Sequence, residues 1–135
     1  MQYWLIKSEP YKWSWDDQVQ KGVEHWDGVR NYQASNNMKA MELGDLAFFY
    51  HSNEGKEIVG IVEVVKLYYP DHTDPKGRFG MVDFKAVRPI KRFVTLAEIK
   101  ADPNLEEMAL VKQSRLSVAP VREHEWNYIL NLAEG

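Results

Sequence analysis

Residues 46–69 read LAFFYHSNEGKEIVGIVEVVKLYY, and this stretch decides the expected fold. Leu46–His51 is a short apolar run and Glu57–Tyr69 a longer one rich in β-branched residues, so both are expected to form strands. Ser52–Gly55, between them, has the composition of a tight turn. Gly60 interrupts the second run, which predicts a bulge or a bend there. The stretch therefore predicts a β-hairpin.

More strands and several short helices are expected on both sides of this hairpin. Strands are expected at Tyr3–Lys7, Met81–Pro89 and Leu116–Val121. Helices are expected after the capping residues Ser14 and Thr95, at Ser35–Met41 and at Glu123–Ala133. About five or six strands with short helices between them predict an α+β fold with a curved or barrel-like sheet.

The composition is that of a single soluble domain spanning residues 1–135. Hydrophobic residues make up 44% of the chain and charged residues 27%, which suffices for one core. No apolar run approaches the roughly 18 residues that span a bilayer, and the first residues do not resemble a signal peptide. Because cysteine is absent, disulfides and cysteine-based zinc sites are excluded, and the cytoplasm is the expected location.

The overall charge limits the kind of nucleic-acid binding that is plausible. The net charge is −3 and the isoelectric point is near 5.8. These values disfavour a protein that wraps long nucleic acid through many phosphate contacts, but they are compatible with a small binding site.

The sequence lacks the motifs of nucleophilic catalysis, of metal binding and of phosphate-binding loops. His51 and Ser52 are adjacent on an expected strand, so their side chains point to opposite faces and cannot form a nucleophile–base pair. The four histidines, His25, His51, His72 and His124, are far apart in sequence and form no zinc-binding motif. The glycines form no phosphate-binding loop. We therefore expect no catalytic residue, no metal site and no cofactor.

The most unusual feature is the loop WDGVRNYQ that begins at Trp26. Trp26 offers a flat surface for stacking, and Arg30 a cation that can reach a phosphate. Asn31 and Gln33 carry amides that can pair with the edge of a base, so the loop has the groups that an unstacked base needs. The alternative is that Trp26 and Tyr32 are core residues and that the amides only bond to the loop backbone. Composition alone leaves both interpretations open.

Four motifs, YWLIKSEP, WDGVRNYQASNNM, FFYHS and SRLSVAPV, follow one another along the chain. With this order and spacing, the sequence resembles the EVE domain family over essentially its whole length. The resemblance implies a PUA-like fold, a compact pseudo-barrel with helices around it that is akin to the YTH and ASCH domains. It also implies a pocket that reads modified bases in nucleic acid, such as 5-methylcytosine in DNA or a modified base in RNA.

The resemblance further implies which residues form this pocket. One wall is expected from Lys7, Ser8, Glu9 and Pro10, and a second from Trp26, Asn31, Tyr32 and Gln33. Tyr50, His51 and Ser52 are expected at the base of the cleft, and Arg115, Leu116, Ser117 and Val118 at its rim. Many relatives have arginine where this chain has Ser35, which implies the loss of a possible phosphate contact.

The expected partner is modified DNA or RNA. The chain is expected to be a monomer and to have no membrane partner. A base that is flipped out or single-stranded would stack on Trp26 and pair with the loop amides and Ser8. Seven basic residues are candidates for a phosphate-facing strip: Lys85, Arg88, Lys91, Arg92, Lys112, Arg115 and Arg122.

Two other functions stay open at this stage. An enzyme or small-ligand-binding protein acting on a modified nucleoside would use the same pocket, with Glu9 or His51 as acid or base. A protein-interaction module would instead bury aromatic residues such as Tyr68, Tyr69 and Trp126 against a partner.

Overall fold

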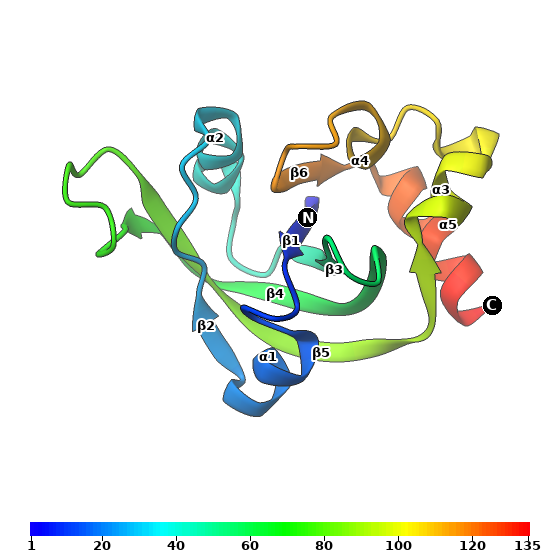
Figure 1. Cartoon of the computed structure of the whole chain (residues 1–135), viewed down its shortest axis with the longest axis horizontal. Helices are drawn as coiled ribbons and strands as arrows, with labels where there is room; N and C mark the ends of the chain where they lie inside the picture. The colour runs from blue at the N-terminus through cyan, green and yellow to red at the C-terminus, as the bar shows by residue number, and fades with distance from the viewer.

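A computed structural model describes residues 1–135 and contains one six-stranded sheet with short helices around it (Figure 1). The strands are β1 (Tyr3–Ser8), β2 (Val23–His25), β3 (Leu46–His51), β4 (Glu57–Pro70), β5 (Gly80–Thr95) and β6 (Val118–Val121). The helices are α1 (Trp15–Lys21), α2 (Tyr32–Ala40), α3 (Leu96–Ala101), α4 (Ala109–Lys112) and α5 (Glu123–Glu134), with a 3₁₀ turn, η1 (Pro103–Leu105). The strand order is β2-β5-β4-β3-β1-β6. The α+β class and the number of strands expected from the sequence are confirmed.

The expected hairpin forms the middle of the sheet. β3 and β4 pair in antiparallel fashion, with Leu46 opposite Glu63, and the register shifts where β3 meets Gly60. A second shift occurs at Gly60 where β4 pairs with β5. Glycine is required at this position, because a Cβ atom at position 60 would lie 2.5 Å from the indole ring of Trp15. The irregularity predicted at Gly60 is therefore confirmed.

β1 lies between β3, which runs parallel to it, and β6, which runs antiparallel. A parallel pair requires a long connection, and here that connection contains α1, β2 and α2. The carboxyl ends of β1 and β3 consequently lie side by side, with Lys7 opposite Tyr50 and Ser8 opposite His51. This end of the sheet is where the residues of the candidate site gather.

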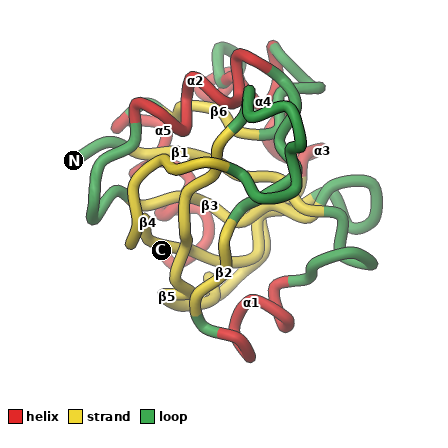
Figure 2. The backbone as a smooth tube through the Cα atoms, turned by 90° about the vertical axis from the view of Figure 1, so that its left-hand side faces the viewer, coloured by secondary structure: helices red, strands yellow, loops and turns green.

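Alternating side chains on the central strands build two hydrophobic cores, one on each face of the sheet. On β1, Trp4 and Ile6 belong to the first core and Leu5 to the second. On β3, Phe49 belongs to the first core and Phe48 to the second. Residues of α1 and α2 complete the first core, and residues of α3 and α5 complete the second. Figure 2 shows these helices around the layer of strands.

The helix ends confirm the capping chemistry expected from the sequence. The Ser14 hydroxyl accepts a hydrogen bond from the Asp17 N–H, and the Asp17 carboxylate accepts one from the Ser14 N–H. α1 ends at Gly22, whose φ of 85° is in the region that favours glycine. The Thr95 hydroxyl caps α3 by accepting from the Glu98 N–H.

Other boundaries differ from the sequence-based expectation. α2 begins at Tyr32 instead of Ser35 because the Asn31 side chain caps it. β5 continues to Thr95 instead of ending near Pro89. β2, η1 and α4 were not expected, since each is only three or four residues long and has too little periodicity to be recognised.

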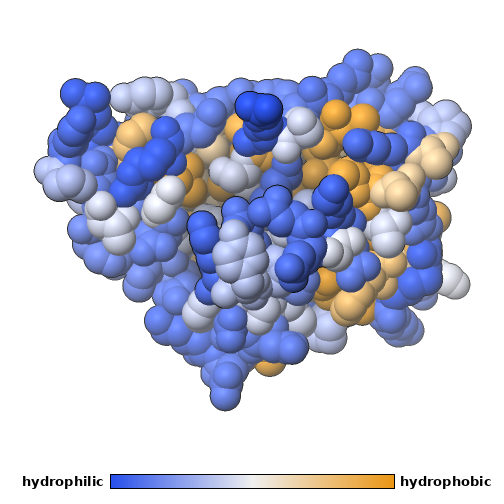
Figure 3. Space-filling view, viewed as in Figure 1, coloured by the Kyte–Doolittle hydropathy of each residue, from blue (hydrophilic) through white to orange (hydrophobic).

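Hydrophilic residues cover most of the face shown in Figure 3, and the hydrophobic residues visible there gather mainly toward the end where α3 and α4 lie. None of the helices has both the length and the apolar character needed to cross a bilayer.

Candidate functional site

A cleft with a volume of about 580 Å³ opens between three segments of the chain. The first is the end of β1 with the turn that follows it, the second runs from β2 to α2, and the third precedes β6; Ser52, just after β3, also lines the cleft. Nine residues expected at the pocket line this cleft: Lys7, Ser8, Glu9, Trp26, Arg30, Asn31, Ser52, Arg115 and Ser117. Motifs that are far apart in the sequence are thus brought to one place.

Gln33 and Leu116 line a smaller neighbouring depression of about 340 Å³. Asn31 and Arg115 border both hollows. Gln33 is exposed in the first turn of α2 and does not line the larger cleft.

Five other expected residues do not line either hollow. Tyr50 is buried in the second core, on the opposite face of the sheet, because it alternates with Phe49 on β3. Burial raises the pKa of Tyr50 to about 12. The side chain of Val118 is fully buried in the first core, and its backbone carbonyl accepts a hydrogen bond from Asn37 Nδ2 at 2.8 Å. Neither side chain can reach a ligand in the cleft.

The remaining three, Pro10, His51 and Tyr32, also lie outside the cleft. The Nε2 atom of His51 accepts a hydrogen bond from the Trp15 N–H at 3.0 Å, so His51 anchors α1 to the sheet. Burial lowers the pKa of His51, which favours this neutral form. Tyr32 is 61% exposed, and its ring lies 4.8 Å from that of Phe79.

Eight residues line the cleft without having been expected there: Lys12, Trp13, Glu24, His25, Asp27, Gly28, Val29 and Ser114. Trp13 is the most important, since it adds a second indole. A turn brings Trp13 back to the cleft. In this turn, the Glu9 carbonyl accepts hydrogen bonds from the N–H groups of Lys12 and Trp13 at 2.9 Å each. The Ser8 hydroxyl also donates to the Trp13 carbonyl. The sequence signal was the proline of the SEPYKW stretch, which ends β1 and favours a turn.

Lys7 joins the first and third segments of the cleft. Its backbone N–H donates to the Ser117 carbonyl at 3.0 Å, and its ammonium group donates to the Ser114 carbonyl at 2.8 Å. Burial lowers the pKa of Lys7. The side chain therefore fixes the rim, and part of its hydrogen-bonding capacity is used within the protein.

Trp26 forms part of the cleft floor instead of a free-standing stacking surface. It is only 9% exposed, and the rings of Phe49 and Phe84 meet its indole edge-on at 5.7 and 5.6 Å. Its backbone N–H donates to the Val82 carbonyl at 2.8 Å. The indole is thus held rigidly by the first core, with a cavity beside it.

Asp71, in the loop between β4 and β5, holds the second segment in place. Its side chain is fully buried, and Oδ2 accepts from the Gly28 N–H at 2.8 Å and from Arg30 Nη1 at 3.1 Å. Its Oδ1 atom accepts from the N–H and hydroxyl of Thr73. Burial acts to raise the pKa of Asp71, but the bonds from Thr73, Gly28 and Arg30 outweigh burial and lower it to about 2.

Asn31 has a structural role as well as a place in the cleft wall. Its Oδ1 accepts from the Ala34 N–H at 2.9 Å, which caps α2. The alternative interpretation, in which the amides bond to the loop backbone, therefore holds for the Oδ1 atom of Asn31. Its Nδ2 group can still donate to another acceptor. Ser35 is buried and its hydroxyl bonds to that of Tyr68 at 2.7 Å, so it does not face the cleft.

Charges of both signs line the cleft. The cations are Lys7, Lys12, Arg30 and Arg115, the acids are Glu9, Glu24 and Asp27, and His25 lies among them. One oxygen of Glu9, Oε2, is buried and accepts no hydrogen bond, although it forms an ion pair with Lys12 Nζ at 3.8 Å. A buried acceptor without a donor is unfavourable, so this oxygen is suited to bind a donor from a ligand.

Three of the seven basic residues considered for a phosphate-facing strip are paired with acids. Arg88 pairs with Glu134, Arg92 pairs with Glu98 at 2.8 Å, and Lys112 pairs with Glu107 at 3.1 Å. Of the seven residues in that strip, only Arg115 lines the cleft.

The chain is similar to one family model and to three known proteins. The family model described as EVE domain matches residues 2–132. Thymocyte nuclear protein 1 of Rattus norvegicus is 42% identical over 98% of this chain and 74% of the relative. An NMR structure from Rhodopseudomonas palustris is 56% identical, with a TM-score of 0.93 over 98% of this chain and 93% of that one. A crystal structure of human THYN1 in complex with 5-methylcytosine containing DNA is 37% identical, with a TM-score of 0.94 over 100% of this chain and 99% of that one.

Proposed function

The chain belongs to the EVE domain family, and we propose that it is a nucleic-acid-binding reader domain that accommodates one modified base in its cleft. The base enters from a single strand or is flipped out of a duplex. Modified DNA is the partner favoured by the similarity to human THYN1 bound to 5-methylcytosine containing DNA, and modified RNA is the second.

The observation that carries the proposal is the cavity of about 580 Å³ beside Trp26. Its volume lies within the range of about 300–1,000 Å³ that is usual for small-ligand sites. Trp13 and Trp26 supply aromatic surface, and Asn31, Ser52 and Ser117 supply polar groups that can bond to the edge of a base. A flat heterocycle is the ligand that uses both kinds of surface.

Glu9 is the residue that we expect to select the base. Its Oε2 atom is buried without a hydrogen bond, and a carboxylate accepts well from the exocyclic amino group of cytosine. Uracil and thymine present a carbonyl oxygen at that position, which a carboxylate repels. The Glu9 carboxylate therefore favours cytosine and its 5-substituted derivatives.

Recognition of a methyl group requires more than hydrophobic burial. Stacking contributes about 1–3 kcal/mol per base and is insensitive to sequence. Burying one methyl group contributes about 0.8 kcal/mol, which corresponds to a preference of roughly fourfold. A rigid pocket raises this to about 1–3 kcal/mol. The packing of Trp26 against Phe49 and Phe84 supplies the rigidity.

The charge of the cleft favours a substrate that is easy to unstack. Four cations are opposed by three acids in the cleft wall, and the Lys7 ammonium and Arg30 guanidinium already bond to the protein. Few phosphate contacts remain to offset the few kcal/mol that flipping a base out of a duplex costs. We therefore expect micromolar affinity and tighter binding to single strands.

The proposed activity is binding and not catalysis. An enzyme acting on a nucleoside in this cleft would need His51 or Glu9 as acid or base. His51 lies outside the cleft, and its Nε2 lone pair is occupied by the Trp15 N–H. Glu9 alone, without a partner base or an activated nucleophile, is suited to hydrogen bonding.

The test is a fluorescence titration of single-stranded oligonucleotides that differ in one base. Cytosine, 5-methylcytosine and thymine at the same position are compared in DNA, and cytosine with 5-methylcytosine in RNA, each at two salt concentrations. We expect the affinity to decrease in the order 5-methylcytosine, cytosine, thymine. Glu9→Gln should weaken binding of both cytosine forms about tenfold, since a charge-assisted hydrogen bond contributes about 1.5–3 kcal/mol.

Glu106→Gln is the matched control, because Glu106 is exposed and lies outside the cleft. It should bind like the original chain. Equal affinity for all three bases, or no binding to any of them, would reject the reader function. Unchanged base preference in Glu9→Gln would reject the role of Glu9.

A further inference from the structure

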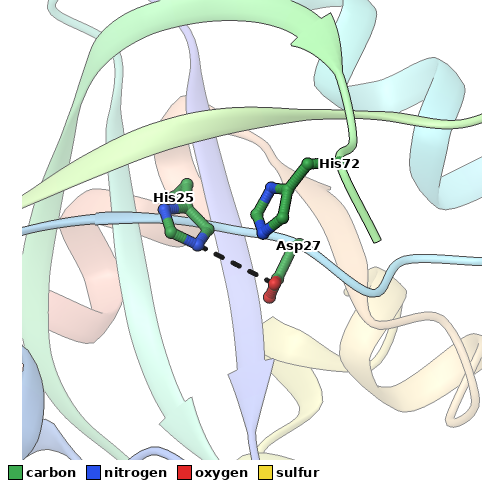
Figure 4. Close-up of side chains that lie close together, drawn as sticks. All are labelled: His25, Asp27 and His72. Carbon is green, nitrogen blue, oxygen red and sulfur yellow. Dashed lines mark ion pairs between the residues drawn. The ribbon is translucent and has the colours of Figure 1, made fainter. Parts of the chain in front are cut away.

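Three side chains able to bind a metal ion meet at the edge of the cleft. His25 ends β2, Asp27 lies two residues later, and His72 comes from the loop between β4 and β5 (Figure 4). Their potential ligand atoms all lie within 4.8 Å of one another. His25 Nε2 is 3.8 Å from Asp27 Oδ2, and the two imidazole rings are 4.9 Å apart at 82°.

The backbone that carries these ligands is fixed by bonds across two loops. The buried Asp71 carboxylate, next to His72, accepts from the N–H of Gly28, which is next to Asp27. Trp26, between His25 and Asp27, bonds to the Val82 carbonyl. The three residues are therefore held together by the fold, although nearly fifty positions separate His25 from His72 in the sequence.

His25 is also oriented by a neighbouring carboxylate. Glu24 Oε1 lies 3.2 Å from His25 Nδ1, on the side of the ring away from Asp27. The nearby Glu24 carboxylate favours the tautomer of His25 with its proton on Nδ1, which leaves the Nε2 lone pair on the side of Asp27. A carboxylate behind a ligating histidine is the usual arrangement in metal sites, where it fixes the tautomer and makes the ligand more basic.

The ligand set determines the class of ion. Two imidazoles and one carboxylate suit zinc and its neighbours, whereas calcium and magnesium prefer oxygen ligands. With bonds of about 2.0–2.1 Å, tetrahedral ligand atoms lie about 3.4 Å apart, so the present spacings have to close by up to about 1.4 Å. The exposed side chains of Asp27 and His72 are free to make this adjustment.

We propose that His25, Asp27 and His72 bind one divalent transition-metal ion of the zinc class. Three protein ligands leave a fourth position open. His25 and Asp27 also line the cleft, so the open position is available to a phosphate oxygen of a strand whose base occupies it. This second part rests on the proposed function, and it adds one phosphate contact to the few that the mixed charges of the cleft can provide.

The first experiment uses the full chain and zinc chloride alone in a calorimetric titration near neutral pH. We expect one ion per chain, with affinity reduced more than about tenfold in His72→Ala and in Asp27→Asn. His124→Ala is the control, because His124 is exposed on α5 and outside the cluster; it should bind zinc normally. Absence of stoichiometric binding, or equal binding by His72→Ala, would overturn the site.

The second experiment repeats the single-strand titration with zinc and with a chelator. We expect zinc to increase oligonucleotide affinity at least about threefold in the original chain and to have no effect in His72→Ala. Zinc binding without such an increase would overturn the phosphate contact. The zinc titration contains no nucleic acid, so failure of the metal site and failure of the reader function are observed separately.

Discussion

Replacing Asp71 by asparagine is predicted to lower the free energy of unfolding by about 2 kcal/mol at neutral pH. Burial acts to raise the pKa of the Asp71 carboxyl, but hydrogen bonds from Thr73, Gly28 and Arg30 lower it from 3.8 to about 2. Since one pKa unit corresponds to about 1.4 kcal/mol, the folded state favours the charged carboxylate by about 2 kcal/mol.

The geometry explains why an amide cannot replace this carboxylate. Oδ2 accepts from Gly28 and Arg30, and Oδ1 accepts twice from Thr73. In either orientation, the NH₂ group of asparagine would therefore face two donors. The loop that carries Gly28 and Arg30 would lose its attachment to the β4–β5 loop, and with it the alignment of the cleft wall.

Thermal and denaturant unfolding at several pH values measure this effect. For 135 residues, about 2 kcal/mol corresponds to a decrease in Tm of about 7 °C. The folded-state pKa is lowered, so the stabilisation is present above pH 3.8 and is lost as the pH falls toward about 2. The two proteins should therefore converge in stability over this interval.

Asp16→Asn is the charge-matched control, because Asp16 is exposed on α1, and it should leave the Tm nearly unchanged. A difference for Asp71→Asn that stays constant down to pH 2 would show that the charge of the carboxylate is not the stabilising element. A decrease of only a few tenths of a kcal/mol in the free energy of unfolding at neutral pH would refute the proposed role of Asp71 in holding the two loops together.

Three further predictions concern other parts of the fold and cleft. Gly60→Ala should destabilise the protein by about 1–3 kcal/mol in denaturant unfolding, because its Cβ would overlap the Trp15 ring; an unchanged midpoint would contradict this packing. Burial lowers the pKa of His51, so its neutral form should stabilise the fold above pH 6.5, and this contribution should fall below that pH in the original chain but not in His51→Gln. Arg115→Gln should weaken oligonucleotide binding equally for all bases and reduce the salt dependence by about one counterion; a base-specific loss would assign Arg115 to base recognition instead.

The parts of the fold that were predictable are those set by local chemistry. The caps at Ser14 and Thr95 depend on a side chain and a backbone N–H three residues away, so the sequence contains all the required information. The β3–β4 hairpin likewise follows from two apolar runs around a turn. Even the irregularity at Gly60 was predictable, although the close approach of the Trp15 ring to this residue was not.

The parts that were not predictable depend on contacts between distant segments. Tyr50 was expected at the cleft, but the alternation of β3 directs it into the second core, and sequence alone does not say which face the cleft uses. Trp13 reaches the cleft only because a tight turn reverses the chain after Ser8. His25 and His72 meet because β2 and the β4–β5 loop lie next to each other, which no spacing rule could indicate.

The structure also changes how the loop WDGVRNYQ should be interpreted. Much of its distinctive chemistry holds the loop in position: Asn31 caps α2, Arg30 bonds to Asp71, and Trp26 packs into the first core. Loss of binding after mutation of these residues would therefore report a displaced loop as readily as a lost contact. Glu9 differs, because its buried Oε2 atom has no hydrogen-bond partner in the protein. A change of base preference in Glu9→Gln, with unfolding unchanged, is for this reason the more direct measure of what the cleft recognises.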